Sequence, residues 1–399
     1  MVEHSSKAAL KDRLSNLPEA DRAKLRQALE MRRSSQSADG ADGLRTHRAD
    51  SRMAFSLFFF SGDGTTRSNQ KYSLLFDSAR LADRSDIAAV WVPERHFVDF
   101  GGLYPNPSVL ASALAAQTTR IGIRAGSVVL PLHHPVRVAE EWSVVDNISN
   151  GRIGVAFASG WHPKDFVIAP GGTGSYPARK DGMFRSIDQL RRLWRGEAIS
   201  FDDGSDPVAT LPRPIQSDLP IWIASQGSEE TFRRAGEIGA GVLTGLVAQR
   251  REDLKHKIEV YRDAFRGAPN TTGDGHVVSM LHTFLGKDDS AVKSQVRGPL
   301  IAYLSIFLDQ KKDTGSPFAE MSAADREVML NTTFERYYGA NVLMGARARC
   351  EAMVEDMVDL GVDEIACLID FGLPDETVLD GLAHLKDLAS TYAAAPHTN

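Results

Sequence analysis

Cysteine is almost absent from this chain: Cys350 and Cys367 are the two cysteines among 399 residues. Neither belongs to a CxxC pattern or to a Cys/His ligand spacing, which excludes a zinc knuckle and a disulfide framework. We expect both to be small buried residues. Two isolated cysteines are also typical of a reducing, cytoplasmic compartment.

Long apolar runs and an excess of basic residues are missing as well. No run approaches the roughly 18 apolar residues that a membrane helix needs, and the charged N-terminus lacks the apolar core of a signal peptide. The chain has 46 Lys and Arg against 52 Asp and Glu, a net charge of −6, so it lacks the basic face that nucleic-acid binding requires. We therefore expect neither a membrane nor a nucleic acid as partner. The composition, 42% hydrophobic and 25% charged, is that of an ordinary globular protein.

The first 50 residues differ from the rest. Residues 17–33, with Pro18 at a first helical position and Leu25 and Leu29 on one face, are predicted to form a short helix. Residues 34–43 are small and polar, which is typical of a flexible linker. Residues 1–50 are therefore expected to form an appendage to a domain over residues 51–399. Either a disordered tail or a docking element for a partner protein fits this composition.

From residue 53 onward, short β-rich runs alternate with helical segments. The expected strands are 53–60, 88–94, 121–130, 152–160, 220–225, 241–246, 276–286 and 364–371. The expected helices are 72–84, 107–117, 135–148, 179–195, 228–238, 251–265, 290–308, 346–360 and 375–392. This alternation predicts an α/β fold, a parallel (β/α)₈ TIM barrel. A doubly wound open sheet is the alternative, but its usual GxGxxG or GxxxxGK[ST] loop does not occur in the sequence.

The chain is longer than the roughly 250 residues of a plain barrel. We expect the excess in loops, chiefly residues 161–178, 196–219 and 309–345. A glycine-rich loop, residues 61–67, follows the first expected strand. Loops after strands build the active-site face of such a barrel, so these insertions are candidates for covering a site.

Histidines gather at three neighbouring strand ends. Glu94-Arg95-His96 follows the second expected strand, His133-His134 the third and His162 the fourth. An imidazole titrates near neutral pH, which suits general acid–base catalysis, so His96 and His162 are the leading candidates. No HxH or HExxH spacing accompanies them, and we expect no metal site.

A second cluster suits an anion. Ser225-Gln226-Gly227-Ser228 joins the fifth expected strand to a helix that Ser228 can cap, and Gly227 lets backbone amides approach a phosphate. Arg179, which opens the preceding helix, is the candidate cation. A capped helix without a ligand explains the same residues equally well.

Longer stretches resemble a known family. Residues 91–97 (WVPERHF), 102–107 (GLYPNP), 129–140 (VLPLHHPVRVAE) and 145–152 (VDNISNGR) are similar to segments of the bacterial luciferase-like monooxygenases. The resemblance runs in order through residues 53–392.

Two further stretches narrow the resemblance. Residues 157–163 (FASGWHP) and 363–372 (DEIACLIDFG) resemble the subgroup found in natural-product biosynthesis, beside nonribosomal peptide and polyketide assembly lines. Residues 14–25 are similar to a linker helix of those assembly-line proteins.

The resemblance implies a TIM barrel that uses FMN, supplied as FMNH₂ by a separate flavin reductase. O₂ adds to C4a of the reduced flavin, and the hydroperoxide then hydroxylates carbon or nitrogen or carries out a Baeyer–Villiger oxidation. Long loops over the barrel suit such a site, because the peroxyflavin must be shielded from water. The implied substrate is a small molecule or an acyl or aminoacyl group on a carrier protein. A homodimer through the early helices is also implied.

The resemblance assigns roles to particular residues. It places the flavin phosphate at Ser225, Gln226, Gly227 and Ser228, with Arg179 as the charged clamp. It places Ser159 and Trp161 in the flavin pocket, and Gly126-Ser127 where the family often has a non-proline cis peptide against the flavin ring.

The implied catalytic residues follow the second and fourth strands. Glu94 and His96 occupy the positions of an active-site Glu and His in the family. Arg95 is expected to orient an anionic or carbonyl substrate, and His162 and His133 are further candidates.

Two residues depart from the light-emitting luciferases. Those enzymes have a histidine at the position of Arg95, so we do not predict bioluminescence. They have an arginine at the position of Ser159, which leaves the phosphate charge to Arg179 and backbone amides. Two other functions stay open: an F420-dependent oxidoreductase on the same barrel, and a non-catalytic flavin-binding or carrier-docking accessory protein.

Overall fold

The computed structural model describes residues 53–393 apart from 61–69, 202–204, 248 and 310–320. The expected appendage, residues 1–50, and the glycine-rich loop at 61–67 lie outside the described residues. Among the helices that are described, none combines the length and apolar character needed to span a bilayer.

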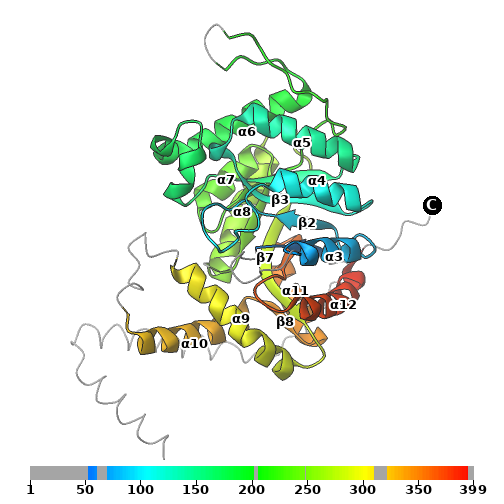
Figure 1. Cartoon of the computed structure of the whole chain (residues 1–399), viewed down its shortest axis with the longest axis vertical. Helices are drawn as coiled ribbons and strands as arrows, with labels where there is room; N and C mark the ends of the chain where they lie inside the picture. Colours follow the sequence, from blue (N-terminus) through cyan, green and yellow to red (C-terminus); the bar gives the residue numbers. More distant parts are fainter. Residues whose placement is uncertain (1–52, 61–69, 202–204, 248, 310–320, 394–399) are drawn as a thin grey trace, which may run out of the picture. The chain divides into compact units, whose positions relative to one another are not determined.

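Eight parallel strands form a closed barrel (Figure 1). In barrel order they are β1 (Ala54–Phe58), β2 (Ala89–Val92), β3 (Gly122–Val129), β4 (Ile153–Ala158), β5 (Ile221–Ala224), β6 (Gly241–Gly245), β7 (Val277–Leu285) and β9 (Glu364–Leu368). Pairing of β9 with β1 completes the ring. Each strand lies inside its expected range, and the predicted (β/α)₈ barrel is confirmed.

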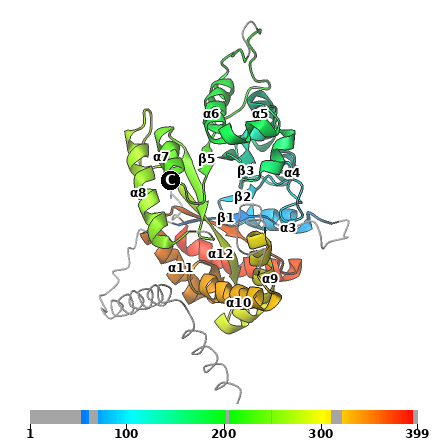
Figure 2. The same ribbon diagram turned by 90° about the vertical axis from the view of Figure 1, so that its left-hand side faces the viewer.

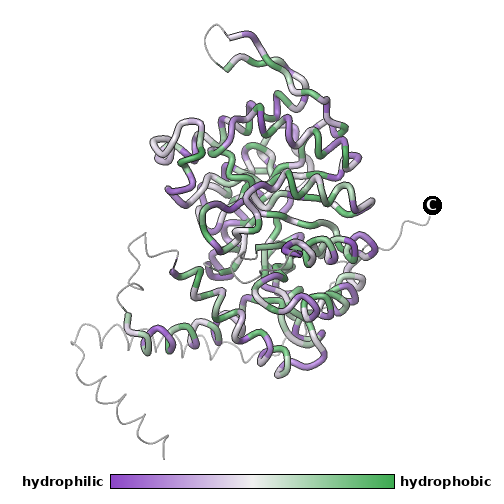
Figure 3. The backbone as a smooth tube through the Cα atoms, viewed as in Figure 1, coloured by the Kyte–Doolittle hydropathy of each residue, from purple (hydrophilic) through white to green (hydrophobic). Residues whose placement is uncertain are grey.

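Helices surround the strands (Figures 1 and 2). They are α3 (Ser73–Ala82), α4 (Pro107–Gln117), α5 (Pro135–Ser149), α6 (Arg179–Arg195), α7 (Glu229–Glu237), α8 (Arg251–Gly267), α9 (Asp289–Asp309), α11 (Arg347–Asp359) and α12 (Asp375–Tyr392). Every helix that the sequence predicts between residues 72 and 392 forms to within two residues of its expected ends, whereas the helix predicted over residues 17–33 lies outside the described residues. The central strands are hydrophobic, whereas the helices alternate between hydrophilic and hydrophobic along their length, as expected of helices packed on one side (Figure 3).

Local signals explain why the helices begin where they do. Pro107 occupies the first turn of α4, and the side chain of Asn106 accepts hydrogen bonds from the amides of Ser108 and Val109. The end of α6 is set by Gly196, whose φ of 92° is in the left-handed region that favours glycine. These are short-range features, and therefore the sequence predicts them well.

The expectation of a loop over residues 309–345 is wrong for its second half. That part contains helix α10 (Ala323–Ala340) and a short strand, β8 (Leu343–Gly345), which pairs with the end of β7 outside the barrel ring. Ser322 caps α10, and Phe334, Tyr337 and Tyr338 bury its last turns. α10 packs beside α9 (Figures 1 and 2). The sequence gives only a weak helical signal here, because Val328 in the middle of α10 is exposed and the buried residues are those near its end.

The expected loops 161–178 and 196–219 hold short local structure. The first contains two 3₁₀ helices, η2 (Pro163–Ile168) and η3 (Thr173–Ala178). The second contains an antiparallel bridge between Ile199 and Val208. A third 3₁₀ helix, η1 (Leu130–Leu132), continues directly from β3.

The interior of the barrel is filled unevenly. Toward the amino ends of the strands, Trp91 and Trp222 contact each other with ring centroids 5.2 Å apart, and the guanidinium of Arg124 lies 5.0 and 4.8 Å from these centroids. Gly154 and Gly241 accommodate this filling, because a Cβ at either position would come within 2.7 or 2.3 Å of the Trp222 ring. The large side chains close this end, so a ligand site belongs at the opposite end, where the strands finish.

Candidate active site

A buried carboxylate organises the barrel mouth. Glu94 follows β2, and its side chain is 0% exposed. Its Oε1 lies 2.8 Å from Nε2 of His96 and 2.6 Å from Nε2 of His133, while Oε2 accepts a hydrogen bond from the amide of Val129 at 2.7 Å. Burial by itself raises the pKa of Glu94, but the hydrogen bonds from His133 and His96 outweigh it, so the pKa is lowered. Glu94 is therefore an ionised carboxylate held between two imidazoles.

His133 is more closely tied to this carboxylate than its sequence position indicates. It follows η1 at the end of β3, and its side chain is 29% exposed. Burial lowers the pKa of His133, but the hydrogen bond to Glu94 and the charge of Glu94 outweigh that effect, so the pKa is raised. His133 therefore carries positive charge over a wider pH range than a free histidine.

A second polar group faces the first from the loop after β4. The guanidinium of Arg95 lies 4.7 Å from the ring centroid of Trp161, and its Nη1 is 3.7 Å from Oδ2 of Asp165. Burial lowers the pKa of Arg95 and raises the pKa of Asp165, and in each case the charge of the partner acts in the opposite direction. These contacts join the segment after β2 to the segment after β4.

His162 completes this second group. Its Nδ1 is 3.8 Å from Oδ1 of Asp165, too far for a hydrogen bond, and it finds no hydrogen-bond partner within the described part of the chain. This nitrogen is therefore available to form a hydrogen bond with another molecule.

The structure thus brings the four predicted catalytic residues, Glu94, Arg95, His96 and His162, into one region. The charges of all four residues act on the pKa of Asp165. Sequence reasoning gave Asp165 no role, although a carboxylate three residues after a candidate histidine is a usable signal. Across the described residues, no three His, Cys, Asp or Glu side chains are arranged to hold a metal ion.

The peptide bond between Gly126 and Ser127 is cis, as the resemblance implies. It lies in β3, where the pairing with β4 shifts register between Gly126 and Val128. A Cβ at position 126 would come within 2.7 Å of the Phe58 ring and 3.1 Å of Trp91, so only glycine fits. Contact of this peptide with a flavin stays a prediction.

The predicted anion cluster lies at the start of α7. Ser228 caps this helix by accepting a hydrogen bond from the amide of Thr231 at 3.4 Å. The space beside Gly227 is open, since the nearest atom to a Cβ built there is Nζ of Lys257, 3.9 Å away. Lys257 on α8 is a cation that sequence reasoning missed, because nothing local in α8 distinguishes it from its neighbours. Glycine, a helix N-terminus and a lysine together form a cradle that fits a phosphate.

Arg179, the predicted clamp, is held beside the loop after β4. Its Nε donates to the carbonyl of Gly160 at 2.9 Å, and its Nη1 donates to the carbonyl of Tyr176 at 3.1 Å. The guanidinium also lies 3.9 Å from the ring centroid of Tyr176. Arg179 therefore stands next to the predicted flavin-pocket residues Ser159 and Trp161, which flank Gly160.

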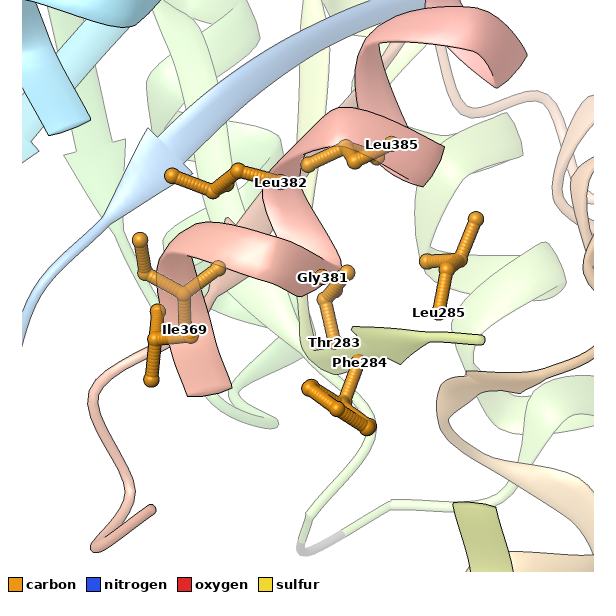
Figure 4. A pocket seen from close by; sticks show the side chains of 8 residues that line it. Thr283, Phe284, Leu285, Ile369, Gly381, Leu382 and Leu385 are labelled. Atoms are coloured by element: carbon orange, nitrogen blue, oxygen red, sulfur yellow. The ribbon is translucent and has the colours of Figure 1, made fainter. Parts of the chain in front are cut away.

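One small pocket lies elsewhere in the barrel wall (Figure 4). It is enclosed between β7 and α12 by Thr283, Phe284, Leu285, Ile369, Val378, Gly381, Leu382 and Leu385. None of the predicted site residues lines it. Its apolar lining against the outer helix marks a gap in packing and not a site for polar chemistry.

Comparison with known proteins finds relatives of this chain among flavin-dependent monooxygenases. The oxygenase component of a flavin-dependent trigonelline monooxygenase from Acinetobacter baylyi is 28% identical over 182 residues, 44% of this chain and 49% of that protein. The chain spans about half the length of the first curated relatives it matches.

Two solved structures share the fold. Monooxygenase RslO1 from Streptomyces bottropensis has a TM-score of 0.67 and 24% identity, covering 86% of this chain and 100% of that one. The oxygenating constituent of 3,6-diketocamphane monooxygenase from Pseudomonas putida, a type II Baeyer–Villiger enzyme solved with FMN, has a TM-score of 0.67 and 19% identity, covering 86% and 99%.

The family follows from the sequence match. The model of the family described as luciferase-like monooxygenase matches residues 53–364, which is most of the chain and all but the last strand and helix of the barrel. This chain belongs to the luciferase-like monooxygenase family.

Proposed function

We propose that this protein is a monooxygenase that uses FMNH₂ and O₂ to hydroxylate carbon or nitrogen, or to carry out a Baeyer–Villiger oxidation. The observation that carries the proposal is the ionised, fully buried Glu94 bonded to His96 at the mouth of a barrel of this family. A carboxylate placed so deeply orients an imidazole, which is the arrangement that proton transfer requires.

The flavin would be held by residues after β3, β4 and β5. The cradle at Ser225, Gln226, Gly227 and Ser228 fits the phosphate, with Arg179 and Lys257 as cations. Gly126, Ser127, Ser159 and Trp161 would contact the ring system. Open space beside Gly227 supports this fit. When bound, the reduced flavin supplies the electrons that activate O₂.

The chain's own residues would orient the substrate and move protons. His96 donates or accepts a proton at the ring nitrogen that does not face Glu94. Glu94 fixes the ring and balances its charge. His162, whose Nδ1 lacks a partner among described residues, offers a hydrogen bond to a substrate. Arg95 holds the loop after β4 against the mouth through Asp165 and Trp161, and we expect it to orient an anionic or carbonyl group.

The substrate class and partners extend this proposal. The resemblance of residues 157–163 and 363–372 supports a role in natural-product biosynthesis, with an acyl or aminoacyl group on a carrier protein as substrate. The trigonelline relative is named as an oxygenase component, which supports a separate flavin reductase as partner. Residues 1–50 would assist docking to the carrier protein. A homodimer and a cytoplasmic location complete the proposal.

The decisive experiment incubates the full chain with FMN, a flavin reductase, NADH and O₂, and with candidate acyl and aminoacyl groups both free and carrier-bound. Intact-protein mass spectrometry is expected to show the gain of one oxygen atom on a carrier-bound substrate. The gain must depend on both FMN and reductase, and the free acid must react more slowly.

Two other outcomes would replace the proposal. Tight binding of F420 with substrate oxidation in the absence of O₂ would identify an F420-dependent oxidoreductase. Binding of FMN without turnover of any substrate would identify a flavin-binding accessory protein.

A further inference from the structure

His133 and His96 compete for a single oxygen atom. Both Nε2 atoms lie within hydrogen-bond distance of Oε1 of Glu94, at 2.6 Å and 2.8 Å. The remaining oxygen, Oε2, is occupied by the amide of Val129. Because an ionised carboxylate has one unit of charge to balance, any charge on His133 weakens the attraction of Glu94 for charge on His96.

The two histidines differ in their access to solvent. The side chain of His133 is 29% exposed and that of His96 is 11% exposed. His133 also lines a small pocket between α4 and α5, together with Asn106, Ser108 and Glu141. His133 is therefore the more solvent-accessible of the two histidines, and it borders a pocket that His96 does not line.

Charged groups on neighbouring elements act on this pair from two sides. From α5, Glu141 raises the pKa of His133, and Arg137 lies 2.9 Å from Glu141. From the loop after β4, Asp165 and His162 face His96 and Glu94, and Asp165 is in turn paired with Arg95. Among the described residues, His133 and His96 are the two titratable side chains that form direct hydrogen bonds with Glu94.

We propose that His133 is a positioning residue that acts on His96 through Glu94, by competing for the same carboxylate oxygen. When His133 is protonated, its positive charge already balances the negative charge of Glu94, and His96 is then a stronger acid. When His133 loses its proton to solvent, the full charge of Glu94 falls on His96, which then retains its proton to higher pH. The proton moves between His133 and water, so an N–H bond of His133 is broken as an O–H bond of water forms, or the reverse, and no other bond changes. The role of this coupling in catalysis rests on the proposed function, whereas the effect of His133 on the protonation of His96 does not.

The test is a titration of histidines in the full chain without flavin. Protein labelled with ¹³C at the Cε1 of its 11 histidines is titrated by NMR, and the His96 signal is assigned with His96→Gln. His133→Gln keeps a hydrogen-bond donor but removes the charge. We expect the midpoint of His96 to rise by between about half and one pH unit in this variant.

Two further variants separate coupling from a loss of structure. His133→Lys restores a cation and is expected to return the His96 midpoint toward the wild-type value. His134→Gln changes the adjacent histidine, which packs against Phe201 and makes no described contact with Glu94, and is expected to leave the midpoint unchanged. An unchanged His96 midpoint in His133→Gln, or an equal shift in His134→Gln, would overturn the proposal.

An activity measurement keeps this result distinct from the proposed function. If the protein is a monooxygenase, the limb of the pH–rate profile that reports His96 is expected to move in His133→Gln by the same amount as the NMR midpoint. A shifted midpoint in a protein without oxygenase activity would support the coupling and refute the function. A shifted midpoint with an unmoved pH–rate profile would overturn the catalytic part of the proposal.

Discussion

Two buried glutamates lie at opposite ends of the same barrel, and their partners differ. Glu364 begins β9 at the base, where its carboxylate binds Nη1 of Arg124 at 2.8 Å and accepts hydrogen bonds from Ser56 and Trp91. Glu94 follows β2 at the mouth, where its side-chain partners are His96 and His133. In both glutamates, the partners lower the pKa of the carboxyl group by more than burial raises it.

Glu364 belongs to a structural ion pair, whereas Glu94 belongs to a site whose partners can change charge. Arginine keeps its proton at any physiological pH. His276, whose Nε2 lies 3.7 Å from Oε2 of Glu364, has a pKa that burial lowers, so it is neutral at neutral pH and the base of the barrel stays in one charge state. Histidine changes charge near neutrality, so the mouth has several states of similar energy. In TIM barrels the base serves stability and the mouth serves chemistry. The contrast between Glu364 and Glu94 shows the same division in this protein.

The largest expected effect comes from removing the charge at the mouth. Glu94→Gln preserves size but no longer balances an imidazolium, so we expect turnover to fall by about 10²–10⁴-fold, the usual contribution of acid–base catalysis. FMN affinity should not change, because no predicted flavin contact is lost. Steady-state kinetics and flavin titration measure the two quantities.

The control for this change is Glu140→Gln on α5. Glu140 is an exposed carboxylate whose described ion-pair partner is Arg137, 3.8 Å away. Its replacement should leave turnover at the wild-type level. Normal turnover in Glu94→Gln would remove the functional half of the comparison.

The matching change at the base is expected to affect stability and not turnover. Glu364→Gln leaves the charge of Arg124 without its carboxylate beside the Trp91 and Trp222 rings, so the free energy of unfolding should fall by about 3–5 kcal/mol. Turnover per folded molecule should persist. Urea unfolding, with activity normalised to the folded fraction, tests both statements.

A double variant, Glu364→Gln with Arg124→Leu, sharpens this result. It removes both charges and should regain part of the lost stability, since an unpaired charge costs more than the absence of a pair. A loss below about 1 kcal/mol in Glu364→Gln would place it among ordinary surface substitutions and contradict the structural role of the base.

The barrel could be predicted from the sequence because its signals are local. Runs of Val and Ile marked the strands, and residues such as Asn106-Pro107 marked the helix starts. The order of the strands then placed Glu94, His96, His133 and His162 at one end. Local signals failed for α10, because its buried residues lie near its end while Val328 in its middle is exposed.

The bonds within the site could not be predicted in the same way. Glu94 and His133 are 39 residues apart and meet because β2 and β3 are neighbours, which fixes proximity but not which atoms bond. Lys257 reaches the space beside Gly227 through the packing of α8 against α7, a relation that no short pattern encodes. Asp165 depends likewise on how an insertion folds over the mouth.

A smaller effect is expected at Lys257, which contrasts with Arg124 at the base. Arg124 is bound to a carboxylate, whereas the described hydrogen bond of Lys257 is to the neutral amide of Gln249 at 3.0 Å, leaving its charge for a phosphate. Lys257→Ala should weaken FMN binding roughly tenfold, the value of one charge-assisted hydrogen bond. Lys255→Ala, an exposed lysine on the same helix, is the matched control and should not change the dissociation constant. Equal effects from the two would indicate general electrostatics and remove Lys257 from the phosphate cradle.

The smallest expected effect is a difference in how the two ends respond to pH. The folded pKa of His133 is raised, so its contribution to stability is complete below its unfolded pKa near 6.5 and disappears as pH rises through the folded value. Both glutamates have lowered pKa values, so their contributions persist above their unfolded pKa near 4.5 and disappear only in acid. His276 beside Glu364 has a lowered pKa and is already neutral at pH 7. Between about pH 7 and pH 9, the stability difference between wild type and His133→Gln should therefore shrink, while that between wild type and Glu364→Gln should stay constant. Urea unfolding at both pH values measures these differences. A pH-dependent difference at Glu364, or a constant one at His133, would mean that the two ends do not divide into a locked pair and a titratable one.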